Sequence, residues 1–179
     1  MKITFIRHGA VEEKYIGKYN GHIDISLGND GVLQMREVAK KISNISFDAV
    51  FCSDLKRAKE SCKLLNLDIT PQYTKALREK SWGEHEGMSF AEICKTGLKY
   101  ESFEQWIENL RGESIVEFKK RVFDFFKYIY TLKYKHILIV THSGVIKTFI
   151  SNIENISLEK AFSTQVPYGF IKTYDIITE

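Results

Sequence analysis

The sequence predicts an α/β fold: a three-layer sandwich in which a mostly parallel central sheet is flanked by helices. Short β-rich apolar segments alternate with segments whose apolar residues recur at helical spacing, a pattern typical of parallel sheets. The chain has 179 residues, 44% of them apolar, which is enough for a sizeable core. Because it has two prolines and no tract rich in Ser, Gly or Pro, we expect residues 1–179 to form a single domain.

In the first half of the chain, strands are expected at 2–6 (KITFI) and 48–52 (DAVFC). Both are nearly continuous apolar runs, as in strands buried on both faces of a sheet. A helix is expected over 32–42 and another over 55–65, because apolar residues recur there every three or four positions. A shorter strand-like stretch follows at 69–73.

In the second half, Ser114 and Glu117 form a capping box that begins a helix with a continuous apolar stripe to Ile129. Strands are expected at 136–141 (HILIVT) and 168–176, with a helix starting near Gly144 between them. Residues 77–113 break the alternation and contain both tryptophans, Trp82 and Trp106. We expect this segment to be a helical excursion that covers the active-site end of the sheet.

Composition excludes several classes of function. The 26 basic and 23 acidic residues are scattered along the chain, so no nucleic-acid partner is expected. Three cysteines without a C-x-x-C pair argue against a disulfide framework and a zinc site, and favour a reducing compartment. No apolar run is long enough for a membrane span, and no signal peptide is recognisable, so a cytoplasmic location without membrane contact is expected. The oligomeric state is not indicated.

Polar, anion-binding groups follow three of the predicted strands. They are Arg7-His8-Gly9, the stretch from Ser53 to Arg57, and Thr141-His142-Ser143-Gly144. Ligands of parallel α/β sheets bind beyond the carboxyl ends of the strands, where these residues would meet. Glycines let backbone N–H groups approach a ligand, and a helix N-terminus favours an anion. The sequence therefore predicts a phosphate pocket.

The residue types in this pocket suit phosphoryl transfer. Arginine donates paired hydrogen bonds to phosphate oxygens, and a neutral histidine can attack phosphorus. The reaction also needs a proton for the leaving group. A carboxyl close to a bound phosphate dianion binds its proton more tightly, as a general acid requires. The candidate acids are Glu12, Glu13, Glu79, Glu84 and Glu86, and Glu79 is preferred because it follows a strand-like stretch.

Four segments in order resemble the histidine phosphatase superfamily, in its phosphoglycerate mutase-like branch. "RHG" (7–9) matches the signature after the first strand, and "SDLKRAKES" (53–61) is similar to S-x-L-x-R-A-x-x-T. "LREKSWGEHEG" (77–87) is similar to L-x-E-x-x-F-G-x-W-E-G, and "VTHSG" (140–144) to V-x-H-G-G. The resemblance implies that His8 is the nucleophile that forms a phosphohistidine. It also implies that Arg7, Arg57 and His142 clamp the phosphoryl group, and that Glu79 donates the proton and then activates water.

The same resemblance implies the remaining contacts to phosphate or substrate. Asn20 and Gly21 lie in "YNGHIDISL" (19–27), which is similar to the family's loop after the nucleophile, although Asn-Gly is equally a turn signal. Lys14 stands where the family usually has asparagine, and a lysine keeps phosphate affinity. Ser143 replaces a glycine but still offers its backbone amide. The expected binding set is Gly9, Lys14, Asn20, Gly21 and Ser143, whereas the other histidines, His22, His85 and His136, are expected to be structural or on the surface.

The sequence thus predicts a phosphomonoesterase for small-molecule substrates that uses no metal and no cofactor. Metal binding is not expected because no histidines and carboxylates stand at ligand spacings. Within the family, "YNGHIDISL", "TPQY" (70–73) and "RGESIVEFKKRV" (111–122) most resemble α-ribazole phosphatases of cobalamin synthesis. The alternatives are a broad-specificity phosphatase, a phosphoglycerate mutase-type enzyme and a non-catalytic module that binds phosphorylated ligands. A phosphoprotein phosphatase is disfavoured because the excursion at 77–113 would crowd the site.

Overall fold

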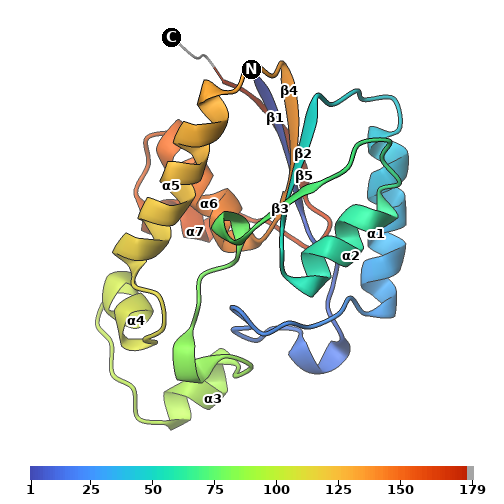
Figure 1. Cartoon of the computed structure of the whole chain (residues 1–179). Coiled ribbons are helices and arrows are strands. Elements are labelled where there is room, and N and C mark those ends of the chain that lie inside the picture. Colours follow the sequence, from blue (N-terminus) through green and yellow to red (C-terminus); the bar gives the residue numbers. More distant parts are fainter. Residues whose placement is uncertain (177–179) are drawn as a thin grey trace.

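The central sheet has five strands in the order β3-β2-β4-β1-β5 in the computed structural model, which describes residues 1–176 (Figure 1). The strands are β1 (Lys2–Arg7), β2 (Ala49–Ser53), β3 (Gln72–Thr74), β4 (His136–Thr141) and β5 (Ile171–Asp175). The first four are parallel, and β5 pairs antiparallel with β1 at the edge. The predicted α/β class, a mostly parallel sheet flanked by helices, is confirmed.

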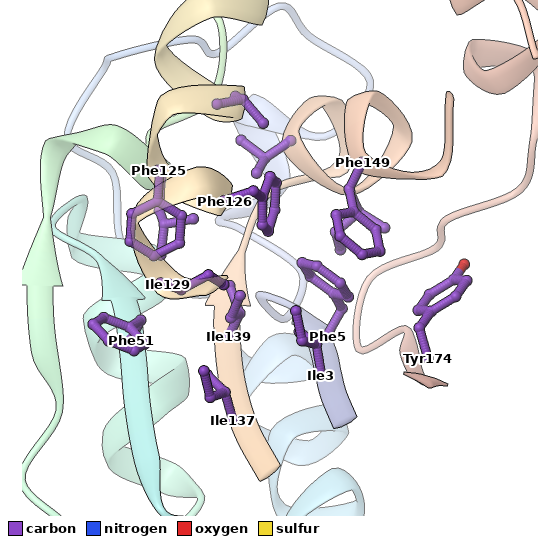
Figure 2. Close-up of a cluster of buried hydrophobic side chains, with 14 of the residues drawn as sticks. Ile3, Phe5, Phe51, Phe125, Phe126, Ile129, Ile137, Ile139, Phe149 and Tyr174 are labelled. Atoms are coloured by element: carbon purple, nitrogen blue, oxygen red, sulfur yellow. The ribbon is translucent and has the colours of Figure 1, made fainter. Parts of the chain in front are cut away.

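Helices cover both faces of this sheet. Figure 1 shows α1 (Asn29–Ile42) and α2 (Lys56–Leu64) on one side, and α5 (Ile115–Thr131), α6 (Ser143–Ile153) and α7 (Leu158–Ser163) on the other. Each face has its own apolar core because the inner strands alternate side chains to both faces. Figure 2 shows the larger core, where the Phe5 ring packs against those of Phe126 and Phe149, and Tyr174 packs against Phe5 and Phe149.

The pairing of β1 with β4 positions the chemistry. Their register pairs Arg7 with Thr141, and the His8 N–H donates to the Thr141 carbonyl at 3.0 Å. The residues that follow both strands therefore emerge side by side, His8 beside His142. This arrangement is the direct consequence of two parallel strands that end at the same edge.

Several element boundaries differ from the sequence prediction, and α1 begins at Asn29 instead of at 32. The last strand begins at Ile171 rather than at 168, because Gly169 has φ +68° and the Phe170 N–H closes a turn onto the Pro167 carbonyl at 3.0 Å. The third strand is shifted to Gln72–Thr74, where it pairs with the end of β2. The capping box of α5 is present as predicted, with the Glu117 N–H donating to the Ser114 hydroxyl at 3.1 Å.

The excursion at 77–113 lies at the end of the sheet where the parallel strands finish (Figure 1). It contains η3 (Gly83–His85), α3 (Phe90–Lys95) and α4 (Phe103–Asn109), and is preceded by η2 (Lys75–Leu77). These helices share a small core of their own, made of Trp82, Ile93, Trp106, Ile107 and Leu110. Among residues 1–176, no helix combines the length and apolar character needed to cross a membrane.

Candidate active site

A cavity of about 210 Å³ opens at the carboxyl ends of β1 and β4. Four cationic side chains and a single carboxylate contribute to its lining: Arg7, Lys18, Arg57, Lys147 and Glu79. The polar part of the lining also includes His8, Asn20, Gly21, Ser143 and Gly144. This surplus of positive charge in a concave site suits a phosphorylated ligand.

His8 has a hydrogen-bond pattern that selects one tautomer. Its Nδ1 lies 2.8 Å from the Gly9 carbonyl, which can only accept, so Nδ1 carries the proton. Its Nε2 accepts from the Arg57 Nε–H at 3.3 Å. Burial, and then the charges of Arg57 and Arg7, lower the pKa of His8 well below its ordinary value. The imidazole is therefore neutral at pH 7, with the Nε2 lone pair facing a guanidinium.

Arg57 lies in the first turn of α2, and its side chain returns to the end of the sheet as expected. It is 2% exposed and donates to the carbonyls of Gly21 and Ile23 at 2.8 Å each. Burial lowers its pKa to about 10, so it remains a cation at neutral pH. The neighbouring carbonyls and His8 hold the guanidinium in place before any ligand arrives.

Arg7 approaches from the end of β1. Its guanidinium donates to the Val166 carbonyl at 2.6 Å and stacks on the Tyr168 ring with a carbon-to-centroid distance of 4.0 Å. The buried Nε–H has no partner among residues 1–176. A buried donor without a partner is costly, and a phosphoryl oxygen would satisfy it.

His142 is fully buried beside the nucleophile candidate, with its ring centroid 5.0 Å from that of His8. Its Nε2 is hydrogen-bonded to the Ser53 hydroxyl at 2.7 Å. Burial and the charge of Arg57 lower the pKa of His142 well below its ordinary value. Its Nδ1 has no partner within the described part of the chain, although His142 itself does not belong to the cavity lining.

Glu79 is the carboxylate of the cavity, and both of its oxygens are held by backbone. The Lys80 N–H donates to Oε1 and the Gly144 N–H to Oε2, each at 3.0 Å. A Cβ at Gly144 would overlap this carboxylate, so any side chain there would displace it. The structure thus brings His8, Arg7, Arg57 and Glu79 together around one cavity, with His142 behind the lining, against the His8 ring.

Asn20 and Gly21 lie on the opposite wall. Asn20 donates from Nδ2 to the Tyr15 carbonyl at 2.8 Å, and its buried Oδ1 has no partner among residues 1–176. Gly21 has φ +44°, and a Cβ there would overlap the Glu86 carboxylate. Both residues therefore line the cavity, and their contact with phosphate stays a prediction.

A comparison with family models matches residues 3–177 to the histidine phosphatase superfamily, branch 1. The chain belongs to this superfamily. It is 26% identical to the adenosylcobalamin/α-ribazole phosphatase of Escherichia coli, over 98% of this chain and 90% of that protein. It is 24% identical to a 2,3-bisphosphoglycerate-dependent phosphoglycerate mutase of Rhizobium etli, over 99% and 91% of the two chains.

Solved structures give the same relationship. The α-ribazole phosphatase of Shigella flexneri superposes with a TM-score of 0.86 at 26% identity, covering 99% of this chain and 91% of that one. The family and the named phosphatases among its relatives identify this chain as a phosphatase. The predicted family and the predicted enzyme class are both confirmed.

Two predicted binding residues of this histidine phosphatase lie away from the cavity lining. The Gly9 N–H is already bound to the Ser61 hydroxyl at 3.1 Å, and a Cβ at Gly9 would collide with the backbone of Gly31. Close packing of β1 against α1 therefore explains this glycine. Lys14 has a side chain that is 68% exposed and pairs with Glu12 at 3.4 Å. Its place at the end of η1 (Glu13–Tyr15) directs it to solvent instead of to the phosphate.

Several lining residues of this phosphatase were not predicted from the sequence. Lys147 lies one turn after Ser143 on α6, so helical periodicity could have placed it at the same rim. Lys18 and Tyr168 lie in loops, whose course the sequence pattern does not reveal. Aromatic side chains of the lining also include Tyr19, Trp82 and Phe162.

The remaining histidines and aromatic residues have structural contacts. His22 donates from Nε2 to the Glu79 carbonyl at 2.8 Å, and His85 is buried with Nδ1 bonded to the Leu110 carbonyl at 2.9 Å. Trp106 packs in the excursion and donates to the Tyr19 hydroxyl at 3.1 Å. Of these residues, His22 adjoins the site, because it holds the backbone of the carboxylate.

Proposed function

We propose that this phosphatase is a phosphomonoesterase that works without a metal ion, through a phosphohistidine on His8. The observation that carries the proposal is the state of His8: buried, neutral, protonated on Nδ1, and with Nε2 beside the Arg57 guanidinium. A neutral imidazole nitrogen surrounded by fixed cations is what in-line attack on a phosphate monoester requires. Within residues 1–176, no cluster of three or more His, Cys, Asp or Glu side chains could hold a metal ion.

In the first half of the reaction, a phosphoryl oxygen replaces Nε2 as the partner of the Arg57 Nε–H. The freed Nε2 lone pair of His8 attacks phosphorus, an N–P bond forms and the ester P–O bond breaks. Glu79 donates a proton to the leaving alcohol oxygen. The guanidinium groups of Arg7 and Arg57 stabilise the charge on the equatorial oxygens. His142 adds an Nδ1–H donor in the tautomer whose Nε2 accepts from the Ser53 hydroxyl.

In the second half, Glu79 is a carboxylate and accepts a proton from water. The resulting oxygen nucleophile attacks phosphorus, the N–P bond breaks and its electron pair returns to His8 Nε2. Inorganic phosphate then leaves, and Glu79 again carries the proton with which it began. The two backbone N–H groups at Glu79 keep the carboxyl aimed at the cavity through both halves.

For the substrate, we propose α-ribazole 5′-phosphate, with a broad range of phosphomonoesters as the alternative. The first is supported by the names of the relatives from Escherichia coli and Shigella flexneri. Aromatic walls from Tyr19, Trp82 and Tyr168 suit an aromatic base next to the phosphate. The alternative is supported by the small cavity, because about 210 Å³ encloses a phosphate and little more, so that the rest of a substrate stays outside.

Trapping the phosphoenzyme tests the mechanism. Acid-stable labelling is not expected for phosphohistidine, so the enzyme is quenched in alkali during turnover and the modified residue is located by mass spectrometry. Label on His8, loss of turnover in His8→Ala, and full activity with a chelator present would support the proposal. Label on another residue, or activity that disappears with the chelator, would contradict it.

A substrate panel tests specificity and separates the related reactions. It includes α-ribazole 5′-phosphate, sugar phosphates, 3-phosphoglycerate and phosphopeptides. A preference of about a hundredfold in kcat/KM, near 3 kcal/mol, identifies a dedicated substrate, whereas a flat profile identifies a generalist. Transfer of phosphate to 3-phosphoglycerate in place of water would identify a mutase. Binding of phosphorylated ligands without turnover would identify a non-catalytic module.

A further inference from the structure

The backbone that carries Glu79 runs beyond the sheet, since β3 ends at Thr74 and Glu79 lies five residues later. Its carbonyl groups therefore need partners other than a neighbouring strand. The Thr141 hydroxyl binds the Leu77 carbonyl at 2.7 Å. The carbonyls on either side of Leu77 are bound by one side chain, that of Arg121 on α5.

Arg121 spreads its guanidinium over this segment. Nη1 donates to the carbonyls of Ala76 and Arg78 at 2.8 and 3.0 Å, and Nη2 reaches the Glu79 carbonyl at 3.4 Å. A longer contact of 3.4 Å runs from Nη1 to the Lys75 carbonyl. One planar side chain thus binds four carbonyls between 75 and 79, a task for which the flat, multiply donating guanidinium is suited.

Glu113, at the end of the excursion, orients that guanidinium. Its two oxygens accept from Arg121 Nε and Nη2, both at 2.7 Å, in a paired arrangement. The two side chains are only 21% and 15% exposed. Paired, partly buried hydrogen bonds of this kind have a defined direction, so they fix the guanidinium plane against the backbone. Both residues belong to "RGESIVEFKKRV" (111–122), and no residue of this segment takes part in the catalytic steps above.

We propose that Arg121, oriented by Glu113, is a positioning residue for the general acid Glu79. Arg121 binds the backbone carbonyl of Glu79, whereas the N–H groups of Lys80 and Gly144 bind its side-chain carboxylate. Loss of this support lets the 75–79 backbone shift and misplaces the proton donor relative to the leaving oxygen. The inference rests on the role proposed for Glu79.

The dependence on the leaving group tests this role. An alkyl phosphate needs a proton on its leaving oxygen, whereas p-nitrophenyl phosphate leaves without one. For Arg121→Met we expect kcat/KM to fall about 30-fold or more with the alkyl phosphate and less than about threefold with p-nitrophenyl phosphate. The ratio kcat/KM is compared because it reports phosphoryl transfer to His8 and excludes the later hydrolysis, in which Glu79 acts as a base on the same intermediate for both substrates. Glu113→Gln, which keeps the side-chain shape, shows the same selectivity with a smaller loss. A loss of general stability would slow both substrates equally.

Matched controls isolate the effect of the guanidinium. Lys120 is the neighbour of Arg121 on α5 and pairs with Asp124 on the exposed face, so Lys120→Met removes a charge without touching the 75–79 segment. This variant keeps wild-type activity with both substrates. Arg121→Lys keeps the positive charge but not the planar set of N–H donors, so its activity is expected to lie between those of Arg121→Met and the wild-type enzyme. Thermal melting of each variant separates unfolding from mispositioning.

A double variant gives the decisive comparison. If Arg121 acts through Glu79, Arg121→Met adds no further leaving-group dependence to Glu79→Gln. Selective loss in Glu79→Gln with equal losses for both substrates in Arg121→Met would overturn the positioning role and leave the proposed mechanism intact. Absence of selective loss in Glu79→Gln itself would instead remove the assigned acid, and the positioning inference would fall with it.

Discussion

His8 and His142 are packed edge to face in the interior, next to two guanidinium groups. Each imidazole is buried, and a proton on either ring would face the charge of Arg57 at close range. The positive charges that favour binding of an anion in the cavity therefore also help to keep these two imidazoles unprotonated. His8, the proposed nucleophile, therefore needs no deprotonation before it attacks.

These two histidines predict how stability depends on pH. In the unfolded chain each titrates near pH 6.5, and in the folded protein the pKa of each is well below that value. Well above pH 6.5 both histidines are neutral in the folded and in the unfolded chain, so their protonation does not reduce the free energy of unfolding there. Below it the unfolded chain binds protons that the folded protein excludes, so the free energy of unfolding falls, by at most about 1.4 kcal/mol per pH unit and histidine.

Urea unfolding at pH 7.5 and 5.5 measures this loss. We expect His8→Asn to show a smaller drop between the two pH values than the wild-type chain, because one of the two bases is gone. An equal drop in both proteins would mean that His8 does not have the lowered pKa on which the neutral-nucleophile argument depends.

Gly144 supports a second prediction about a single position. A methyl group there overlaps the Glu79 carboxylate, so Gly144→Ala must displace the acid. Since a displacement of about 1 Å can cost about a hundredfold, we expect a loss of that order in kcat with alkyl phosphates. Gly97→Ala is the control for backbone strain alone, since Gly97 has a positive φ, unlike Gly144, and has open space around its Cβ position. Comparable losses in the two variants would contradict a specific effect on Glu79.

The helices around the site serve both packing and chemistry. α5 buries Phe118, Val122 and Phe126 against the sheet and turns Arg121 toward the segment that carries Glu79. α6 begins at Ser143, so its first N–H groups lie at the cavity, where the Gly144 N–H binds Glu79. The same two helices therefore cover the core and hold the catalytic carboxylate in position.

The start of α5 gives a prediction of stability. The Ser114 hydroxyl accepts from the Glu117 N–H, and the Glu117 carboxylate accepts from the Ser114 N–H at 2.9 Å. Ser114→Ala removes the hydroxyl acceptor and is expected to cost about 1 kcal/mol of unfolding free energy. Urea unfolding measures this cost. Ser163→Ala, at the last residue of α7, serves as the comparison, with an expected change of less than about 0.5 kcal/mol. An equal loss of unfolding free energy in the two variants would contradict a capping role for Ser114.

Taken as a whole, the molecule concentrates charge where its sheet ends. The net charge is only +3, yet four cations and one carboxylate line a single small cavity. This concentration arises because parallel strands β1 and β4, together with the loops near 18–21 and 166–168, all meet at one edge. Binding of an anion there neutralises cations that otherwise repel one another, so it should stabilise the entire fold.

Orthovanadate, an analogue of phosphate that adopts trigonal-bipyramidal geometry, tests this coupling. At about 100 times its Kd it should add about 2.7 kcal/mol of unfolding free energy. For a chain of this size that corresponds to a rise in Tm of about 5–10 °C. Differential scanning fluorimetry with a chelator present measures the shift. Arg57→Met should show almost none of it, and an undiminished shift in that variant would place the anion elsewhere.

The sequence by itself determined the α/β class, the order of the main elements and the family, because alternating apolar runs and motif spacing are properties of adjacent residues. It also brought His8, Arg57, Glu79 and His142 into one predicted site, since parallel strands must end at the same edge. Only the tertiary structure decided that Gly9 serves packing, that Lys14 points to solvent, and that Lys18 and Lys147 line the cavity instead. The support of Glu79 by Arg121 likewise became visible only there, because it joins residues about forty positions apart in the sequence. Loop paths and side-chain directions depend on such distant contacts, which local periodicity does not encode.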